Sequence, residues 1–383
     1  MPPLHTTRVP MPHPPPPQQF STAVGRGLAL AALICASSVC AARAAGAAPG
    51  GPTTDRPQTR EFVDSAGRHV MLPRTVHRVF AAGPPAAILL YTLAPDKLLG
   101  WTRPLPAAAR QYVAPDERNL PVLGRLSGRG NTANLETVLR RRPDVIVDYG
   151  SVAPTYVSLA NRVQAQTGIP YVLIDGSFDT IPKAYRLLGK MLGASARAER
   201  LADYAEHTLR DVVRVRAQLP AGGGPGVYYG RGPDGLVTGL GGSINVELLG
   251  VVGAGNVAAA AGKGGLREVS MEQVLAWDPG VIVTLNPHFF RRVHSDPLWR
   301  GVRAVRDHRV YLAPDLPFGW FDRPPSVNRL MGVKWLLAVL YPRRAPQNLR
   351  QATREFYSMF YHVELDNRQL HQLLENAGGT DQR

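Results

Sequence analysis

Residues 134–147 read NLETVLRRRPDVIV, and residues 270–283 read SMEQVLAWDPGVIV. Both stretches begin with a residue that can cap a helix, Asn134 or Ser270, and both carry a glutamate two residues later. A capping side chain accepts a hydrogen bond from a free backbone N–H, and an early glutamate complements the positive end of a helix. Each predicted helix leads through a proline to an unbroken apolar run, which is typical of a strand buried on both faces. The sequence therefore predicts the same helix–strand unit twice.

The alternation of helix and strand continues on both sides of the first copy. Apolar runs that predict strands lie at residues 76–81, 97–101, 144–148 and 171–174. Helical segments are expected at residues 85–91, 135–142 and 156–166. Further apolar runs that predict strands around the second copy lie at residues 227–229, 281–285 and 310–312. Strands that alternate with helices indicate parallel sheets covered on both faces, so we expect an α/β protein with two Rossmann-like lobes.

The two predicted lobes are separated by a segment of a different kind. Residues 179–220 carry helical periodicity with two internal glycines, which predicts one long linking helix or a pair of helices. We expect the N-terminal α/β lobe at residues 61–178 and the C-terminal α/β lobe at residues 221–342. The last residues, 343–383, are expected to form a C-terminal helical extension that packs back onto the lobes.

Residues 1–44 are predicted to be a secretory signal peptide. They combine a basic start, an apolar run from Leu28 to Val39 and a small-residue cleavage site after Ala44. The apolar run is shorter than the ~18 residues that a membrane span needs. We therefore expect a periplasmic protein with a disordered leader at residues 45–60.

Both cysteines, Cys35 and Cys40, lie inside the predicted signal peptide. A mature chain without a thiol excludes a disulfide framework, cysteine-based zinc or iron–sulfur sites and a thiol nucleophile. Lipid anchoring through Cys40 is the alternative to a free periplasmic protein, although the residues before Cys40 lack the usual leucine three positions upstream. Met11 is an alternative start.

Composition excludes further classes of protein. The 383 residues carry 44 Lys+Arg against 29 Asp+Glu, a net charge of +15, and 44% of the residues are hydrophobic. A chain of this length and hydrophobicity builds two or three compact domains. The basic residues are spread along the chain instead of forming one stripe with aromatic residues, so no nucleic-acid partner is predicted.

Several short motifs accompany the two matched stretches in a fixed order. They are VDSAGRHVMLP at residues 63–73, TGIP at 167–170, LGKMLG at 188–193, PFGWFDRPPS at 317–326 and LYP at 340–342. In this order and spacing the sequence resembles the periplasmic substrate-binding proteins of ABC importers for iron–siderophore, haem and cobalamin. The resemblance covers nearly all of the mature chain.

The resemblance implies two α/β lobes joined by one long helix, with the ligand in the cleft between them and little closure on binding. It implies a monomer that delivers its ligand to an ABC permease and ATPase complex. It also implies that one exposed glutamate on each lobe meets basic residues of the permease. Glu136 and Glu272 match these docking positions.

Candidate ligand-binding residues follow from the position of the strands. In open parallel sheets the ligand lies beyond the carboxyl ends of the strands. The residues that follow the predicted strands are Gly83, Arg103, Tyr149, Asp175, Arg231, Asn286, His288, Trp320 and Arg323. Arg129, in a glycine-rich loop, is the further candidate, and we expect Arg129 and Arg323 to clamp an anionic ligand. Arginine forks pair with carboxylate or catecholate oxygens while aromatic rings cover the organic body, although loop-fixing arginines are the alternative.

The resemblance and these residues together predict a binding protein for an iron chelate, a siderophore, haem or cobalamin-like complex, with no chemistry and no cofactor of its own. A small oxyanion such as molybdate or tungstate is the alternative ligand, and the volume of the cleft would separate the two. No bare-metal site is predicted, because His288 is the one histidine at a predicted strand end. A nitrogenase-like enzyme, which has comparable lobes, is a distant alternative that would need cysteine ligands.

Overall fold

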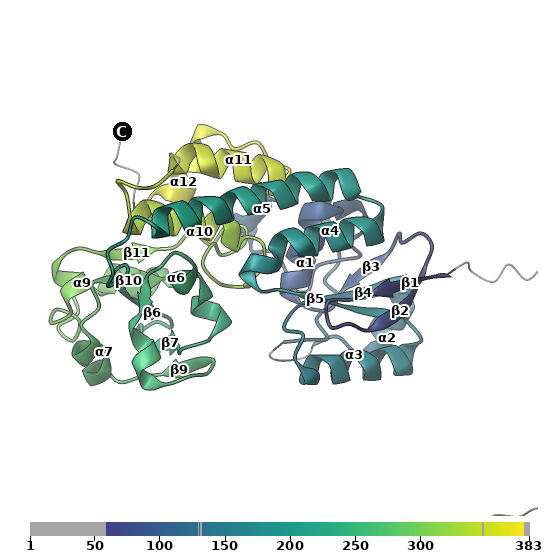
Figure 1. The fold of residues 1–383 in the computed structure, drawn as a ribbon, viewed down its shortest axis with the longest axis horizontal. Coiled ribbons are helices and arrows are strands. Elements are labelled where there is room, and N and C mark those ends of the chain that lie inside the picture. Colours follow the sequence, from purple (N-terminus) through teal and green to yellow (C-terminus); the bar gives the residue numbers. More distant parts are fainter. Residues whose placement is uncertain (1–58, 129, 131, 347, 379–383) are drawn as a thin grey trace, which may run out of the picture. The chain divides into compact units, whose positions relative to one another are not determined.

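The computed structural model describes residues 59–128, 130, 132–346 and 348–378, which belong to one compact unit (Figure 1). The predicted signal peptide and almost all of the predicted leader lie outside the described residues. No helix within the described ranges combines the length and the apolar character that crossing a membrane requires.

The N-terminal lobe is built on a parallel three-stranded sheet. Its strands, in spatial order, are β3 (Val79–Ala81), β4 (Val145–Gly150) and β5 (Tyr171–Asp175). Helices α1 (Pro84–Leu93), α2 (Leu135–Arg141) and α3 (Pro154–Thr167) cover it. Alternate residues of β4 face two different clusters: Val145 and Val147 pack with α1, and Ile146 packs with α2 and α3. Burial on both faces explains the unbroken apolar run in the sequence.

The C-terminal lobe is built on a parallel four-stranded sheet. Its strands, in spatial order, are β11 (Val310–Leu312), β10 (Val281–Thr284), β6 (Gly226–Gly230) and β8 (Gly255–Asn256). Its helices are α6 (Glu247–Val251), α7 (Met271–Trp277), α8 (Pro287–Arg292) and α9 (Arg303–Arg306). A small antiparallel pair, β7 (Val237–Gly239) and β9 (Leu266–Glu268), lies beside it. The expected α/β class with two lobes of parallel sheet is confirmed.

The linking segment folds as two helices, and the second and longer of them joins the lobes as expected. Helix α4 (Ile181–Leu192) ends at Gly193, whose φ of 70° is the left-handed conformation that glycine adopts without strain. Helix α5 (Ser195–Arg216) then runs along both lobes (Figure 1). At Gly189 a Cβ atom would lie 2.3 Å from the Cβ of Ala198, so glycine is what lets α4 pack this closely on α5.

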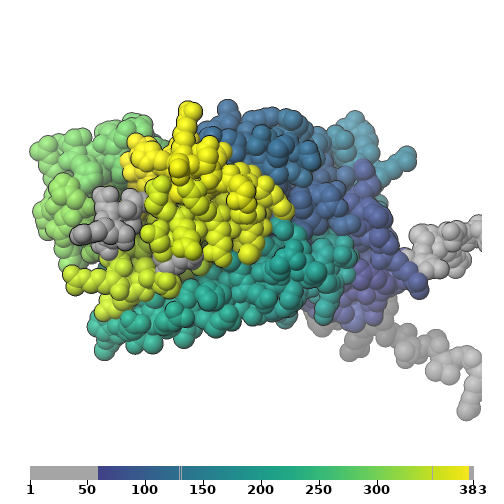
Figure 2. Space-filling view, turned by 90° about the horizontal axis from the view of Figure 1, so that it is seen from above, coloured from purple at the N-terminus to yellow at the C-terminus, as the bar shows by residue number. Residues whose placement is uncertain are grey.

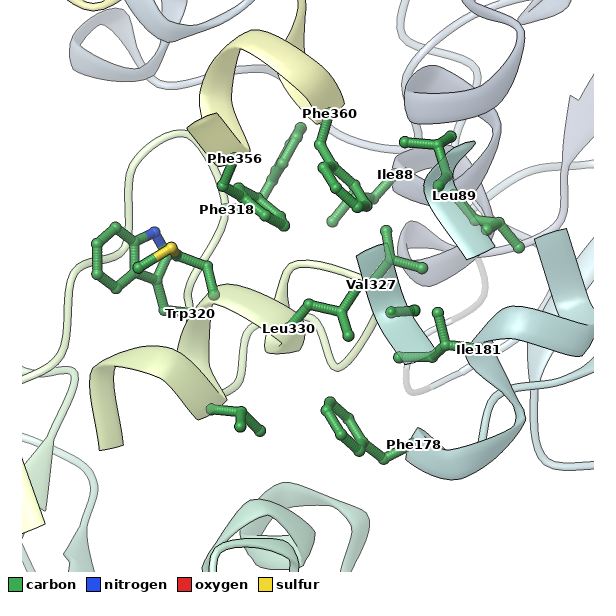
Figure 3. Close-up of a cluster of buried hydrophobic side chains, with 14 of the residues drawn as sticks. Ile88, Leu89, Phe178, Ile181, Phe318, Trp320, Val327, Leu330, Phe356 and Phe360 are labelled. Atoms are coloured by element: carbon green, nitrogen blue, oxygen red, sulfur yellow. The ribbon is translucent and has the colours of Figure 1, made fainter. Parts of the chain in front are cut away.

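The C-terminal helices pack on α5 and on the N-terminal lobe. They are α10 (Arg329–Leu340), α11 (Leu349–Tyr361) and α12 (Asn367–Leu374), and Figure 2 shows them beside α5. The hydroxyl of Tyr91 on α1 donates to the carbonyl of Tyr361, and the indole N–H of Trp335 donates to the carbonyl of Ala377 at 2.7 Å. Figure 3 shows side chains from α1, α4, α10 and α11 meeting in one buried cluster.

Two details of the N-terminal lobe differ from the expectation. An antiparallel hairpin, β1 (Thr59–Val63) and β2 (His69–Pro73), precedes the parallel sheet and was not predicted. Residues 97–101, expected as a strand, form only isolated bridges. Leu98 pairs with Val79 at the edge of the sheet, and Trp101 pairs with Val122. Lys97 ends a short 3-10 helix, and Gly100 lies so close to the carbonyl oxygen of Pro121 that a Cβ there would be 2.3 Å from it.

The first prediction concerns His362, which ends α11 in a left-handed conformation. Its Nε2 atom lies 3.2 Å from the guanidinium of Arg197 and 3.2 Å from the carbonyl oxygen of Tyr91. Burial, and then the charge of Arg197, lower the pKa of His362. The fold therefore favours the neutral ring, and its contribution to stability is present above pH ~6.5 and is lost as the pH falls through the lowered pKa.

We expect His362→Asn to reduce the loss of stability at acidic pH, because asparagine tolerates the left-handed conformation and does not titrate. Urea unfolding of both proteins at pH 7.5 and pH 4 measures the effect. The wild type should lose more free energy of unfolding than the variant between these two pH values. Equal losses would show that His362 does not contribute to the acid sensitivity.

Candidate functional site

A cavity of about 750 Å³ lies between the two lobes. The wall that the N-terminal lobe supplies includes the carboxyl ends of β4 and β5 and the turns that follow them, as expected for parallel sheets. Its C-terminal wall consists of residues 241–247 and parts of α6 and β8. The polar side chains that line it are Ser127, Asp148, Tyr149, Ser151, Tyr156, Asp175, Ser177, Ser243, Glu247 and Asn256.

Two helices direct their N-termini at this cavity. Helix α1 begins at Pro84 and helix α3 begins after Ala153, and both of these residues line the cavity. Neither helix has a side chain that caps its first N–H groups. Pro84 and Pro85 at the start of α1 and Pro154 at the start of α3 carry no N–H group. The positive ends of the two helix dipoles still favour negative charge, so this wall suits an anionic group.

Tyr149 at the end of β4 carries an unsatisfied donor. Its side chain is 1% exposed, it lines the cavity, and its hydroxyl has no hydrogen-bond partner among the described residues. Burial raises the pKa of Tyr149, so the hydroxyl keeps its proton and can donate. A buried donor without a partner costs free energy, which a ligand that accepts this hydrogen bond would recover.

Asp148, the residue before it, is fixed by the protein instead. Its carboxyl group accepts hydrogen bonds from the hydroxyls of Ser127 at 2.9 Å and Tyr171 at 3.1 Å. Burial raises the pKa of Asp148 despite these two donors. The two hydrogen bonds hold the side chain of Asp148 in place. The raised pKa favours its neutral carboxyl group, which repels an anionic ligand less than an ionised carboxylate would.

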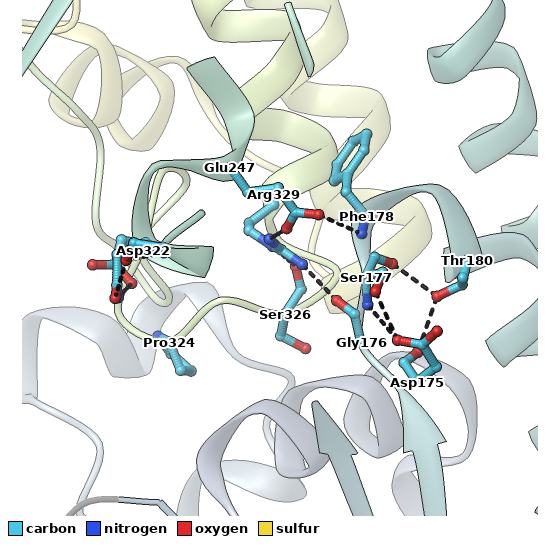
Figure 4. Close-up of polar contacts among 12 residues, drawn as sticks. Asp175, Gly176, Ser177, Phe178, Thr180, Glu247, Asp322, Pro324, Ser326 and Arg329 are labelled. Carbon is cyan, nitrogen blue, oxygen red and sulfur yellow. Dashed lines mark hydrogen bonds and ion pairs between the residues drawn. The ribbon is translucent and has the colours of Figure 1, made fainter. Parts of the chain in front are cut away.

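Glu247 and Arg329 bridge the two lobes at one end of the cavity (Figure 4). The carboxylate of Glu247 pairs with the guanidinium of Arg329 and accepts the backbone N–H of Phe178 at 3.2 Å. Arg329 also donates to the carbonyls of Gly176 at 2.8 Å and Ser326 at 3.2 Å, and it is 0% exposed. A glutamate of the C-terminal lobe and a turn of the N-terminal lobe thus share one buried cation.

The turn after β5 is held by its own hydrogen bonds. The Oδ1 atom of Asp175 accepts from the backbone N–H of Ser177 at 2.9 Å and from its hydroxyl at 2.8 Å. The hydroxyl of Thr180 donates to the carbonyl of Asp175 at 3.1 Å. These contacts, also visible in Figure 4, place Asp175 and Ser177 on the cavity wall at the start of α4.

Of the residues predicted from the sequence, Tyr149 and Asp175 line the cavity. Gly83 lies next to it as the N-cap residue of α1, and a Cβ there would lie 2.8 Å from the hydroxyl oxygen of Ser127. Arg129 lies outside the described residues, so its role stays a prediction. Its neighbour Gly128 lines the cavity.

Three predicted residues of the C-terminal lobe have partners within the protein. Arg231 forms a partly buried ion pair with Asp322, which also accepts from the hydroxyl of Tyr229 at 3.2 Å. Asn286 caps α8 by accepting the backbone N–H groups of the next helical residues. His288 is exposed, with its Nδ1 atom 3.4 Å from the carbonyl of Pro233. Arg231, Asn286 and His288 do not line the cavity.

The structure places Trp320 in the core instead of the cleft, which corrects the prediction from the sequence. Its side chain is fully buried, and its indole N–H donates to the hydroxyl of Tyr357 at 3.2 Å. The physical reason is the close approach of α10, where a Cβ at Gly332 would lie 2.0 Å from the carbonyl oxygen of Trp320. Trp320 is labelled among the core side chains of Figure 3.

Arg103 and Arg323 lie near each other beside segments that line the cavity. The guanidinium of Arg103 is 3.5 Å from the carbonyl oxygen of Arg323. Loss of hydration, and then the charges of Arg323 and Arg125, lower the pKa of Arg103. Neither Arg103 nor Arg323 lines the cavity itself, although Pro325 does.

Sequence reasoning missed most of the C-terminal wall. Residues 241–246 contain a turn at Gly242 and the 3-10 helix Ile244–Val246, and they lack the sequence pattern of a phosphate-binding loop. Gly241, Gly242, Ser243 and Ile244 nevertheless line the cavity. The side chain of Asn245 donates to Asp322 at 2.9 Å and so ties this loop to the ion pair of Asp322 with Arg231. No local signal in the sequence marks this contact. Glu247 was missed for the same reason, because its partner Arg329 lies 82 residues away along the chain.

The profile of the periplasmic binding protein family matches residues 106–316. This is more than half of the sequence. The chain belongs to the periplasmic binding protein family. An ABC transporter solute binding protein from Sulfurospirillum deleyianum is 31% identical, with a TM-score of 0.76, over 82% of this chain and 99% of that chain.

Two further similarities concern other members. A periplasmic solute binding protein from Veillonella parvula is 26% identical, with a TM-score of 0.67, over 84% of this chain and 98% of that chain. The molybdate-binding protein MolA of Haemophilus influenzae is 25% identical over 79% of this chain and 91% of its own length. The family resemblance is confirmed, and these relatives are binding proteins.

Proposed function

We propose that the protein is the periplasmic solute-binding component of an ABC importer and that its ligand is an anionic metal chelate, such as a siderophore, haem or cobalamin-like complex. The observation that carries this proposal is the cavity between the lobes. Its volume of about 750 Å³ falls within the ~300–1,000 Å³ typical of sites for organic ligands. A single tetrahedral oxyanion would fill only a small part of it.

The charges around the cavity support an anionic ligand held mainly by neutral donors. The described residues that line it include no lysine or arginine. The hydroxyl of Tyr149 supplies a neutral donor, and the positive ends of the dipoles of α1 and α3 favour negative charge. Glu247 is neutralised by Arg329, so it repels an anion less than an isolated carboxylate would.

Molybdate is the second candidate ligand. It is favoured by the similarity to the molybdate-binding protein of Haemophilus influenzae over most of both chains. Helix N-termini and glycine-rich turns also suit a small oxyanion. The excess volume of the cavity is what places this candidate second.

Delivery to the permease is assigned to Glu136 and Glu272. Both side chains are exposed, one on each lobe, in the first turn of α2 or α7. Charges at the rim of an interface steer docking and fix its register. The proposal also includes export by the predicted signal peptide at residues 1–44. The protein is proposed to act as a monomer, without a resident cofactor and without catalytic activity.

Native mass spectrometry of the protein taken from the periplasm tests the ligand. We expect an organic, metal-containing mass on the folded protein, and calorimetry with a ferric siderophore, haem or cobalamin should then give saturable binding. A molybdate mass, with calorimetric binding of molybdate alone, would support the second candidate. Absence of any bound mass, together with no heat from any of these probes, would contradict both candidates.

A second prediction concerns the arginines beside the cavity. We expect the double change Arg103→Ala and Arg323→Ala to slow ligand association several-fold at low salt and to change dissociation little, because charges outside the cavity steer an anion without holding it. Stopped-flow binding at 20 and 300 mM salt separates the two rates. A large rise in the dissociation rate would instead show that these arginines clamp the bound ligand.

A further inference from the structure

Helices α2 and α7 are equivalent position by position, although they belong to different lobes. Each begins after a side chain that caps the N–H of the third helical residue: Asn134 accepts from Thr137, and Ser270 accepts from Gln273. Each ends at a residue with a positive φ, 44° at Arg142 and 38° at Asp278. Strands β4 and β10 follow at the same distance, so the surfaces of the two helices can be compared directly.

The comparison shows an exposed leucine at the same position of both helices. Val138 and Val274, at the fourth helical position, are fully buried and anchor the helices. Leu139 and Leu275 follow directly and are 46% and 41% exposed. In the described part of the chain only eight large apolar side chains are at least 39% exposed, and two of them occupy this one position.

Each leucine lies beside a glutamate. Residues three apart on a helix are neighbours on its surface, so Leu139 lies next to Glu136, and Leu275 lies next to Glu272. Both glutamates are exposed. Figure 1 shows α2 and α7 on the side of their lobes that faces away from α5. Each lobe thus presents one carboxylate and one apolar side chain together, and the pair occurs twice.

We propose that Leu139 and Leu275 are the apolar contacts through which the permease holds each lobe, next to the charged contacts of Glu136 and Glu272. This proposal rests on the proposed function in an ABC importer. The partner surface on the permease has two equivalent recesses, one for each lobe. Each recess combines a basic side chain, which meets the glutamate, with an apolar pocket, which takes the leucine. The repeated pair on this chain is the argument for two equivalent recesses.

The two kinds of side chain have different roles in binding. An exposed carboxylate accelerates association and fixes register, and its effect decreases with salt. An apolar side chain that becomes buried in a pocket mainly slows dissociation, and its effect is almost independent of salt. Loss of the glutamates should therefore change the association rate and its salt dependence, whereas loss of the leucines should change the dissociation rate.

The experiment measures binding of the ligand-loaded protein to its cognate permease–ATPase complex in nanodiscs by biolayer interferometry at several salt concentrations. The double variant Leu139→Ala and Leu275→Ala should dissociate about tenfold faster, the size typical of a truncated contact in the centre of an interface, with an unchanged salt dependence. The double variant Glu136→Gln and Glu272→Gln should associate more slowly and lose most of its salt dependence. Val213→Ala, on α5 and 68% exposed, is the matched control and should change neither rate.

The outcomes separate this inference from the proposed function. Dissociation rates of the leucine variant equal to those of the wild type, while the glutamate variant is impaired, would overturn the inference and leave the proposed function standing. A wild-type protein that does not bind the complex would overturn both. Calorimetric ligand affinity and the melting temperature should be the same in all variants, and a leucine variant that melts early would count against a surface role.

Discussion

Replacing Arg329 with methionine is expected to lower the free energy of unfolding by about 3–5 kcal/mol, the cost typical of removing one partner of a buried ion pair. Arg329 is completely buried, pairs with Glu247 and donates to the carbonyls of Gly176 and Ser326. Methionine fills much of the volume but satisfies none of these acceptors. The carboxylate of Glu247 would then face the cavity without its cation.

A second replacement distinguishes the lost ion pair from lost packing. The double variant Arg329→Met and Glu247→Met removes both charges, and we expect it to recover part of the lost stability, because the single change leaves the carboxylate of Glu247, which is 30% exposed, without its cation. Urea unfolding of the wild type and both variants at pH 7 gives the comparison. If the double variant is no more stable than the single one, the cost comes from the two backbone carbonyls instead of from Glu247.

The bridge through Arg329 illustrates what the sequence could not predict. Its partners Glu247 and Gly176 lie 82 and 153 residues away along the chain. Arg329 also begins a helix, where an arginine ordinarily lies exposed. By contrast, the caps at Asn134 and Ser270 and the buried strands that follow involve only neighbouring residues and were predicted correctly. Local chemistry determines these units, whereas the bridge depends on how distant segments pack.

The same distinction explains the candidate site. Tyr149 and Asp175 were found because the end of a parallel strand is a local feature with a general consequence. Trp320 was placed in the cleft by the same rule, because it lies in the loop beyond the predicted strand at residues 310–312. Its burial depends on Tyr357 and Gly332, which belong to helices that the pattern of the loop does not reveal.

Replacing Tyr149 with phenylalanine is expected to weaken ligand binding by about 10–100-fold without destabilising the protein, since a hydrogen bond to a charged group contributes about 1.5–3 kcal/mol. The hydroxyl of Tyr149 has no partner among the described residues, so removing it breaks no contact that the structure shows within the fold. Stability should stay the same or rise slightly, because an unsatisfied buried donor is removed. Calorimetric titration with the ligand found by mass spectrometry and urea unfolding measure the two quantities.

Tyr171→Phe is the matched control, because it removes the same atom from a neighbouring tyrosine whose hydroxyl does have a partner. That hydroxyl donates to Asp148 at 3.1 Å, so this variant should lose about 1–3 kcal/mol of stability. Tyr171 does not line the cavity, so once folded the variant should bind the ligand with nearly the affinity of the wild type. A Tyr149→Phe protein that binds normally but unfolds early would reverse this assignment and show that its hydroxyl serves the fold instead of the ligand.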